Sequence, residues 1–137
     1  MDFANKNKNY KTSEHLTYSC QYHVIFCPKY RRKIFKTPYD AILKEKFYRI
    51  AAEHDFEILE MEVKPDHIHL IIDCNPRFGI VDCITKLKYI SAHEMRREFP
   101  EFKSKLPTLW TRNVFISTAG DVSLESAKEY IHEQRGK

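Results

Sequence analysis

The stretch from Lys64 to Asp73 constrains the fold of this chain most, because it predicts a β-strand with two chemically different faces. A Pro-Asp turn signal precedes a run of aliphatic and β-branched residues, which is typical of a strand. Alternate side chains of a strand share a face, so His67 and His69 point to one side and the aliphatic residues point to the other, into a core. The two histidine Cα atoms are then about 7 Å apart, and their imidazoles can converge on one metal ion. Taken alone, the pair is a weak signal, because two polar histidines on the solvent-facing side of a strand are the more common explanation.

Length and composition indicate one globular domain. The chain has 137 residues, of which 42% are hydrophobic and 31% are charged, and it is long enough to form a core. No apolar run reaches membrane-spanning length and the polar N-terminus is no signal peptide, so we expect a cytoplasmic protein with no membrane partner. We expect residues 1–14 to be a flexible polar segment and residues 15–137 to form the single domain.

The pattern of apolar residues predicts an α+β sandwich. The order is strand, helix, strand, strand, helix, strand, helix, which predicts an antiparallel sheet with helices on one face, in a ferredoxin-like or RRM-like arrangement. A C-terminal helix carries Tyr130 and can lie against the other face of the sheet. Besides the histidine strand, the expected elements cover residues 15–27, 37–54, 56–63, 80–99, 107–118 and 124–135.

A third histidine, His23, lies on the first predicted strand and faces away from Tyr22, Val24 and Phe26. It is a possible third metal ligand. We favour the interpretation that it is a hydrogen-bonded histidine beside the site.

A basic segment follows the first strand directly. Four cations surround one aromatic ring, a composition that suits contact with phosphates and stacking on a base. Like charges in so short a run repel one another unless an anion relieves them, which favours nucleic-acid binding over a solvated loop. The net charge of +4 permits such a partner without demanding it. The segment consists of Lys29, Tyr30, Arg31, Arg32 and Lys33.

The last predicted helix carries Tyr130 and Gln134, which are four residues apart and therefore share a face. Considered alone, a tyrosine and a glutamine at this position would be ordinary surface residues.

Several stretches together resemble the HUH-type single-tyrosine transposases of the TnpA kind, which mobilise insertion sequences as single-stranded DNA. REP-associated tyrosine transposases are relatives of that family. The matching stretches, in order, are Tyr22 to Phe26 leading into Lys29 to Arg32, His67 to Leu70, Leu109-Trp110 with Phe115 to Gly120, and Tyr130 to Gln134.

The resemblance implies a DNA transposase that cleaves and rejoins single-stranded DNA at hairpin-marked element ends through a 5′-phosphotyrosine intermediate. It implies that Tyr130 is the nucleophile and that His67, His69 and Gln134 hold a divalent metal, with Glu133 as the reserve third ligand. We expect Mg²⁺ as the cofactor and Mn²⁺ as a substitute. The implied partners are hairpin-containing single-stranded DNA and a second copy of the chain, with hairpin contacts from the basic segment and Arg112.

Two other functions remain open at this point. A non-catalytic RRM-like module would bind nucleic acid through sheet aromatics and would not need Tyr130. A metal hydrolase would combine the histidine pair with a carboxylate such as Asp66 or Asp73, and it would form no covalent intermediate.

Overall fold

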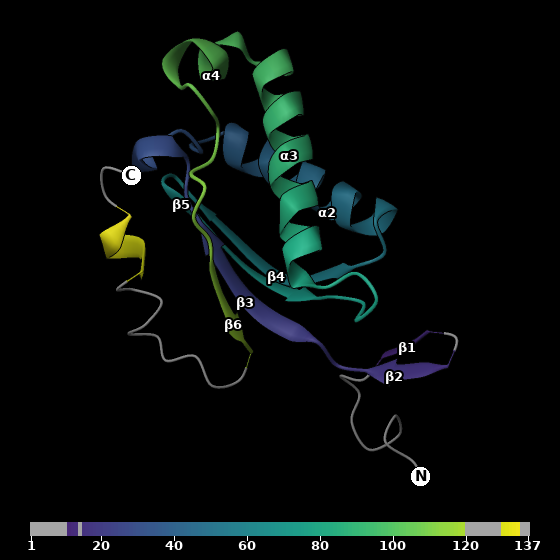
Figure 1. Ribbon diagram of the computed structural model, residues 1–137. Coiled ribbons are helices and arrows are strands. Elements are labelled where there is room, and N and C mark those ends of the chain that lie inside the picture. The colour runs from purple at the N-terminus through teal and green to yellow at the C-terminus, as the bar shows by residue number, and fades with distance from the viewer. Residues whose placement is uncertain (1–10, 14, 120–129, 135–137) are drawn as a thin grey trace.

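A four-stranded antiparallel sheet forms the centre of the protein, with the strand order β4-β5-β3-β6 (Figure 1). The computed structural model describes residues 11–13, 15–119 and 130–134. Helices α2 and α3 cover one face of the sheet. This is the ferredoxin-like α+β arrangement that the sequence predicts. The elements are β3 (Gln21–Phe26), α2 (Tyr39–Glu53), β4 (Glu57–Lys64), β5 (His67–Asp73), α3 (Ile80–Glu98) and β6 (Phe115–Thr118).

The two faces of β5 divide as expected. Ile68, Leu70 and Ile72 are fully buried in the core beneath the helices. His67 and His69 therefore lie on the opposite, open face. β5 pairs with β3 on one side and with β4 on the other, and this places Ile25 and Glu62 beside His69.

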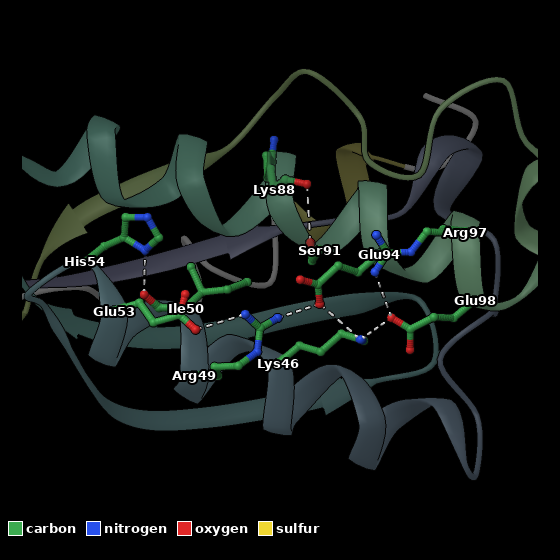
Figure 2. Close-up of polar contacts among 10 residues, drawn as sticks. All are labelled: Lys46, Arg49, Ile50, Glu53, His54, Lys88, Ser91, Glu94, Arg97 and Glu98. Carbon is green, nitrogen blue, oxygen red and sulfur yellow. Dashed lines mark hydrogen bonds and ion pairs between the residues drawn. The ribbon is translucent and has the colours of Figure 1, made fainter.

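Ion pairs join the two helices that cover the core (Figure 2). Lys46 of α2 lies 3.1 Å from Glu94 and 2.8 Å from Glu98, both on α3. Arg49 of α2 also contacts Glu94 and reaches Glu53 on its own helix. A network of this kind fixes the orientation of α2 against α3, although each partly exposed pair contributes only about 0–1 kcal/mol.

Trp110 packs in the core between the sheet and helix α3. Its ring meets Phe26 edge-on with 4.8 Å between centroids and stacks on Phe35 at 5.2 Å. Its indole N–H donates a 3.0 Å hydrogen bond to the hydroxyl of Ser91 on α3. Both residues are buried, so this hydrogen bond ties the segment before β6 to the helix layer.

The last predicted strand is much shorter than expected. Of residues 107–118 only β6 is a strand, and Trp110 forms an isolated bridge with Pro28. An additional helix, α4 (Pro100–Lys105), precedes it. Proline suits the first turn of a helix, and Phe102 anchors this one in the core.

The first predicted strand is divided in two. β2 (Leu16–Tyr18) ends before β3 begins and pairs with β1 (Lys11–Ser13). β1 lies within residues 1–14, so the prediction that this whole segment is flexible is wrong for residues 11–13. At the break, the backbone N–H of Cys20 donates to the Asp73 carboxylate instead of to a neighbouring strand. Residues 1–10 and 14 of that segment lie outside the described residues, as do residues 124–129 and 135 of the last predicted helix. No helix in the described parts of the chain is long and apolar enough to cross a membrane.

We expect Ser91→Ala to lower the free energy of unfolding by about 1–3 kcal/mol, because the buried indole N–H of Trp110 would lose its acceptor. Denaturation in urea measures the change. Ser104→Ala is the matched control, since that exposed hydroxyl donates only to a carbonyl within α4. Equal effects of the two substitutions would contradict a special role for the Trp110–Ser91 hydrogen bond.

Candidate active site

The two histidines of β5 lie on the open face of the sheet and are both half-buried. His67 follows the tight turn between β4 and β5, and its Nδ1–H donates to the Asp66 carboxylate at 2.9 Å. A carboxylate only accepts hydrogen bonds, so this contact leaves the Nε2 lone pair of His67 available for another ligand.

His69 contacts the third histidine of the sheet. Its Nε2 lies 3.1 Å from Nδ1 of His23, and the two rings stack with 5.3 Å between centroids. Burial, and then the neighbouring His23, lower the pKa of His69. The neutral imidazole is the form that binds metals. The contact agrees with the interpretation of His23 as a hydrogen-bonded histidine beside the site.

Tyr130 packs against the same face of the sheet. Residues 130–133 form a turn of helix on the side of the sheet away from α3 (yellow in Figure 1). The ring of Tyr130 lies 5.5 Å from that of Phe115 on β6. Phe115 pairs with Ile25 on β3, and Ile25 pairs with His69. Tyr130 therefore contacts the first of three adjacent side chains, Phe115, Ile25 and His69, which lie side by side across the strands.

Two oxygen atoms on this side are buried without a partner. Gln134 is only 3% exposed, and neither its Oε1 nor the Tyr130 hydroxyl has a hydrogen-bond partner among the described residues. Buried polar atoms are nearly always hydrogen-bonded, so two such atoms together indicate a place for a ligand. Burial, and to a lesser degree the nearby Cys27 thiol, raise the pKa of Tyr130, so the phenol is protonated at neutral pH.

The donor set fits a divalent cation. Within the described residues, no three His, Cys, Asp or Glu side chains converge on one metal position. The amide oxygen of Gln134 belongs to another residue class, and together with two imidazoles it makes a mixed nitrogen and oxygen set. Glu133, the reserve third ligand, is exposed, whereas the adjacent Gln134 is buried.

The two carboxylates that a hydrolase would use differ in their contacts: both oxygens of Asp66 have partners, whereas Oδ2 of Asp73 is buried without a hydrogen-bond partner among the described residues. Asp66 accepts from His67 through one oxygen and lies 2.9 Å from Arg31 Nε through the other. Burial alone would raise the pKa of Asp66, but the hydrogen bond from His67 and the charge of Arg31 hold it below its usual value. Asp73 lies at the far end of β5 and accepts from the backbone of Cys20.

Most of the predicted DNA-binding residues gather beside the site. Lys29 and Tyr30 belong to the short 3-10 helix η1 (Lys29–Arg31), and the Lys29 ammonium lies over the Tyr30 ring at 5.2 Å. Lys29 N donates to Leu109 O, and Thr111 N donates to Cys27 O just before the segment, which brings the segment next to the exposed Arg112. Arg32 and Lys33 are exposed, whereas Arg31 turns inward to Asp66 and is not free to contact a phosphate as we expected.

Sequence reasoning missed two residues that organise this region. The sequence predicts Asp66 as part of a turn and as a possible hydrolase carboxylate, although a carboxylate directly before a ligating histidine is also a signal for a residue that orients it. Lys88 of α3 donates to the carbonyls of Thr111 and Asn113 at 2.9 and 3.0 Å and so holds the backbone on both sides of Arg112. Nothing in the helical pattern distinguishes Lys88 from the other basic residues of α3.

Comparisons with known proteins identify the family of this chain. The family model described as "Transposase IS200 like" matches residues 16–134. The ISDra2 transposase TnpA of Deinococcus radiodurans is 34% identical over 122 residues, which cover 88% of this chain and 87% of the relative. The transposase for insertion sequence element IS200 of Salmonella typhimurium is 27% identical over 126 residues, 90% of this chain and 82% of that protein.

Two solved structures resemble the fold. A crystal structure of a candidate transposase from Deinococcus radiodurans R1 has a TM-score of 0.84 and 28% identity, covering 93% of this chain and 99% of that one. A REP-associated tyrosine transposase, solved bound to a REP hairpin, has a TM-score of 0.56 and 17% identity, covering 89% and 68% of the two chains. The second likeness concerns the fold alone.

We expect the Tyr130 phenol to remain protonated in the folded, metal-free protein at pH values where tyrosine in the unfolded chain ionises, near 10. The measurement is the tyrosinate absorbance of the wild type minus that of Tyr130→Phe, in buffer and in urea at the same pH. Near pH 10 the difference should be near zero in buffer and about half a tyrosinate in urea, because half of the unfolded tyrosines are ionised at their pKa. The same difference in both solvents would contradict the burial of this hydroxyl.

Proposed function

This chain belongs to the family of IS200-like transposases, and on that premise we propose that it cleaves and rejoins single-stranded DNA at hairpin-marked element ends. The proposed nucleophile is Tyr130, which becomes linked to the 5′-phosphate of the cut strand. We further propose that the chain acts as a homodimer, as the family resemblance implies.

One observation carries this proposal. The two unpartnered buried oxygens, on Tyr130 and Gln134, lie on the same side of the sheet as His67 and His69. A purely structural tyrosine and glutamine would have been paired with protein groups or left in water. Their burial without partners supports a site that is completed by a cation and a phosphate.

The reaction exchanges one phosphodiester bond for another. The Tyr130 oxygen attacks the scissile phosphorus in line, the phenol loses its proton, and the bond to the 3′-oxygen breaks as that oxygen gains a proton. The product is a 5′-phosphotyrosine and a free 3′-hydroxyl. Because the phosphodiester energy is conserved, attack by another 3′-hydroxyl rejoins strands without ATP and regenerates Tyr130.

The proposed cofactor is Mg²⁺, with Mn²⁺ as a substitute, held by His67, His69 and Gln134. When bound, it would polarise the phosphoryl oxygen and offset the charge that develops there. The protein residues orient the phosphate relative to Tyr130 and exclude water from a phenol that is already buried.

The basic segment supports a nucleic-acid partner. Lys29, Arg32, Lys33 and Arg112 are candidates for phosphate contacts, and the half-exposed Tyr30 ring is a candidate for base stacking. The hairpin in the solved REP-associated relative agrees with a hairpin as the recognised feature.

A non-catalytic RRM-like module fits less well. Such a module needs exposed aromatic side chains on the open face of its central strands. Among the strand residues described on that face, the aromatic one is Phe115, and Tyr130 packs against it. Histidines occupy the central positions instead.

We expect the wild-type protein to form a covalent adduct with a single-stranded oligonucleotide that carries a hairpin from the DNA flanking the gene. The oligonucleotide is labelled at its 3′ end, because the downstream fragment is the one linked to tyrosine, and adducts are separated on denaturing gels. Tyr130→Phe should reduce the adduct to background, and EDTA should do the same until Mg²⁺ or Mn²⁺ is restored.

Tyr48→Phe is the matched control, because Tyr48 is an exposed tyrosine of α2, in the helix layer on the other face of the sheet. It should form adduct as the wild type does. Adduct in Tyr130→Phe, or its absence from the wild type with every flanking hairpin, would refute the proposed chemistry.

A further inference from the structure

Three side chains connect the basic segment to the first histidine of β5. Arg31 Nε lies 2.9 Å from Asp66 Oδ2, and Asp66 Oδ1 accepts from His67 Nδ1–H at 2.9 Å. The three side chains are between 17% and 19% exposed, so water screens the contacts only in part. Each oxygen of the carboxylate thus has one partner, and the two partners lie on different elements.

The arrangement determines which nitrogen of His67 carries the proton. The carboxylate of Asp66 can only accept, so the hydrogen must be on Nδ1. In the neutral imidazole the opposite nitrogen, Nε2, then presents a lone pair. A histidine that binds a metal through one nitrogen commonly donates from the other to a carboxylate, which fixes both tautomer and ring orientation.

We propose that Asp66 and Arg31 are positioning residues, which hold His67 in the Nδ1–H tautomer with Nε2 presented to the catalytic cation. This inference rests on the proposed function and extends it to two residues outside the ligand set. It also divides the basic segment by role. Arg31 serves the metal site from within the protein, while its neighbours Lys29, Arg32 and Lys33 are left for DNA.

The backbone of the basic segment supports this division. Tyr30 and Arg31 have φ values of 60° and 51°, a left-handed conformation that residues with a Cβ rarely adopt. Such conformations persist where surrounding contacts impose them, and they cluster at functional sites. Here a 2.8 Å hydrogen bond from Arg31 N to Pro28 O closes the turn, and Phe35 N donates to Pro65 O at 3.1 Å. As a result, the Arg31 side chain points inward to Asp66, whereas the neighbouring Tyr30 side chain is exposed.

The first test needs no substitution in the positioning pair. Long-range ¹H–¹⁵N correlation spectra of ¹⁵N-histidine-labelled, metal-free protein report the tautomer of each ring at a pH where imidazoles are neutral. The His67 signals are assigned by their loss in His67→Asn. We expect the Nδ1–H form for His67. A dominant Nε2–H form overturns the proposal.

The second test measures Mn²⁺ binding by electron paramagnetic resonance. Asp66→Ala should weaken Mn²⁺ binding by about 10–100-fold, and Asp66→Asn should weaken it less, because an amide oxygen still accepts from Nδ1–H. Arg31→Gln should also weaken binding, with Arg31→Lys restoring part of it. Arg32→Gln, the exposed neighbour, is the matched control and should bind Mn²⁺ as the wild type does.

The proposal is overturned if Asp66→Ala and Arg31→Gln bind Mn²⁺ as tightly as the wild type, or if the wild type binds none. Circular dichroism establishes that each variant is folded. If Asp66→Ala does not fold, Arg31→Gln and the wild-type tautomer decide the question. Neither measurement contains DNA, so failure of the covalent adduct in the wild type counts against the proposed function alone.

Discussion

The alternation of β5 is the constraint on which the rest of the structure depends. Burial of Ile68, Leu70 and Ile72 stabilises the fold by about 1.5–3 kcal/mol per side chain, and the same burial turns His67 and His69 to the open face. A slip of one residue in register would expose all three aliphatic side chains and bury both imidazoles. Because β3 and β4 pair with β5 on both sides, core stability and the direction of the histidines cannot change independently.

Charge is distributed unequally around these histidines. β4 presents Glu57, Glu60 and Glu62, the last of them beside His69, along one side of the open face. The basic segment and Arg112 lie at the end of β3, near the start of β5. Glu57 is ion-paired with Lys11 and Glu62 lies 3.7 Å from Lys64, so the basic segment is the stronger charged feature, and it attracts a polyanion. In the proposed function, DNA therefore reaches the histidines from η1 and the turn at Asp66.

Local patterns predicted the faces of β3 and β5 and helices α2 and α3, because these depend on periodicity within one element. The order of the elements along the chain predicted the overall arrangement. The role of Arg31 could not be predicted, since its partner Asp66 is adjacent only in the folded chain. The isolated bridge between Pro28 and Trp110 likewise depends on long-range packing of aromatic rings, not on strand propensity. The sequence does contain the signal for α4, a proline followed by an apolar residue that anchors the helix. Because α4 is short and directly follows the longer helix α3, its pattern is not recognised as a separate helix.

The unpartnered state of Tyr130 and Gln134 has a physical cost that the fold does not need. A buried polar atom without a hydrogen bond destabilises a protein by about 1–3 kcal/mol, and neither the Tyr130 hydroxyl nor Gln134 Oε1 has a partner among the described residues. Functional sites commonly keep such unfavourable features, because activity depends on them. Burial raises the pKa of the Tyr130 phenol and so favours its protonated form. The same exclusion of water strengthens any charge interaction at that position, so a cation bound nearby has more influence on Tyr130 than it would have on an exposed tyrosine.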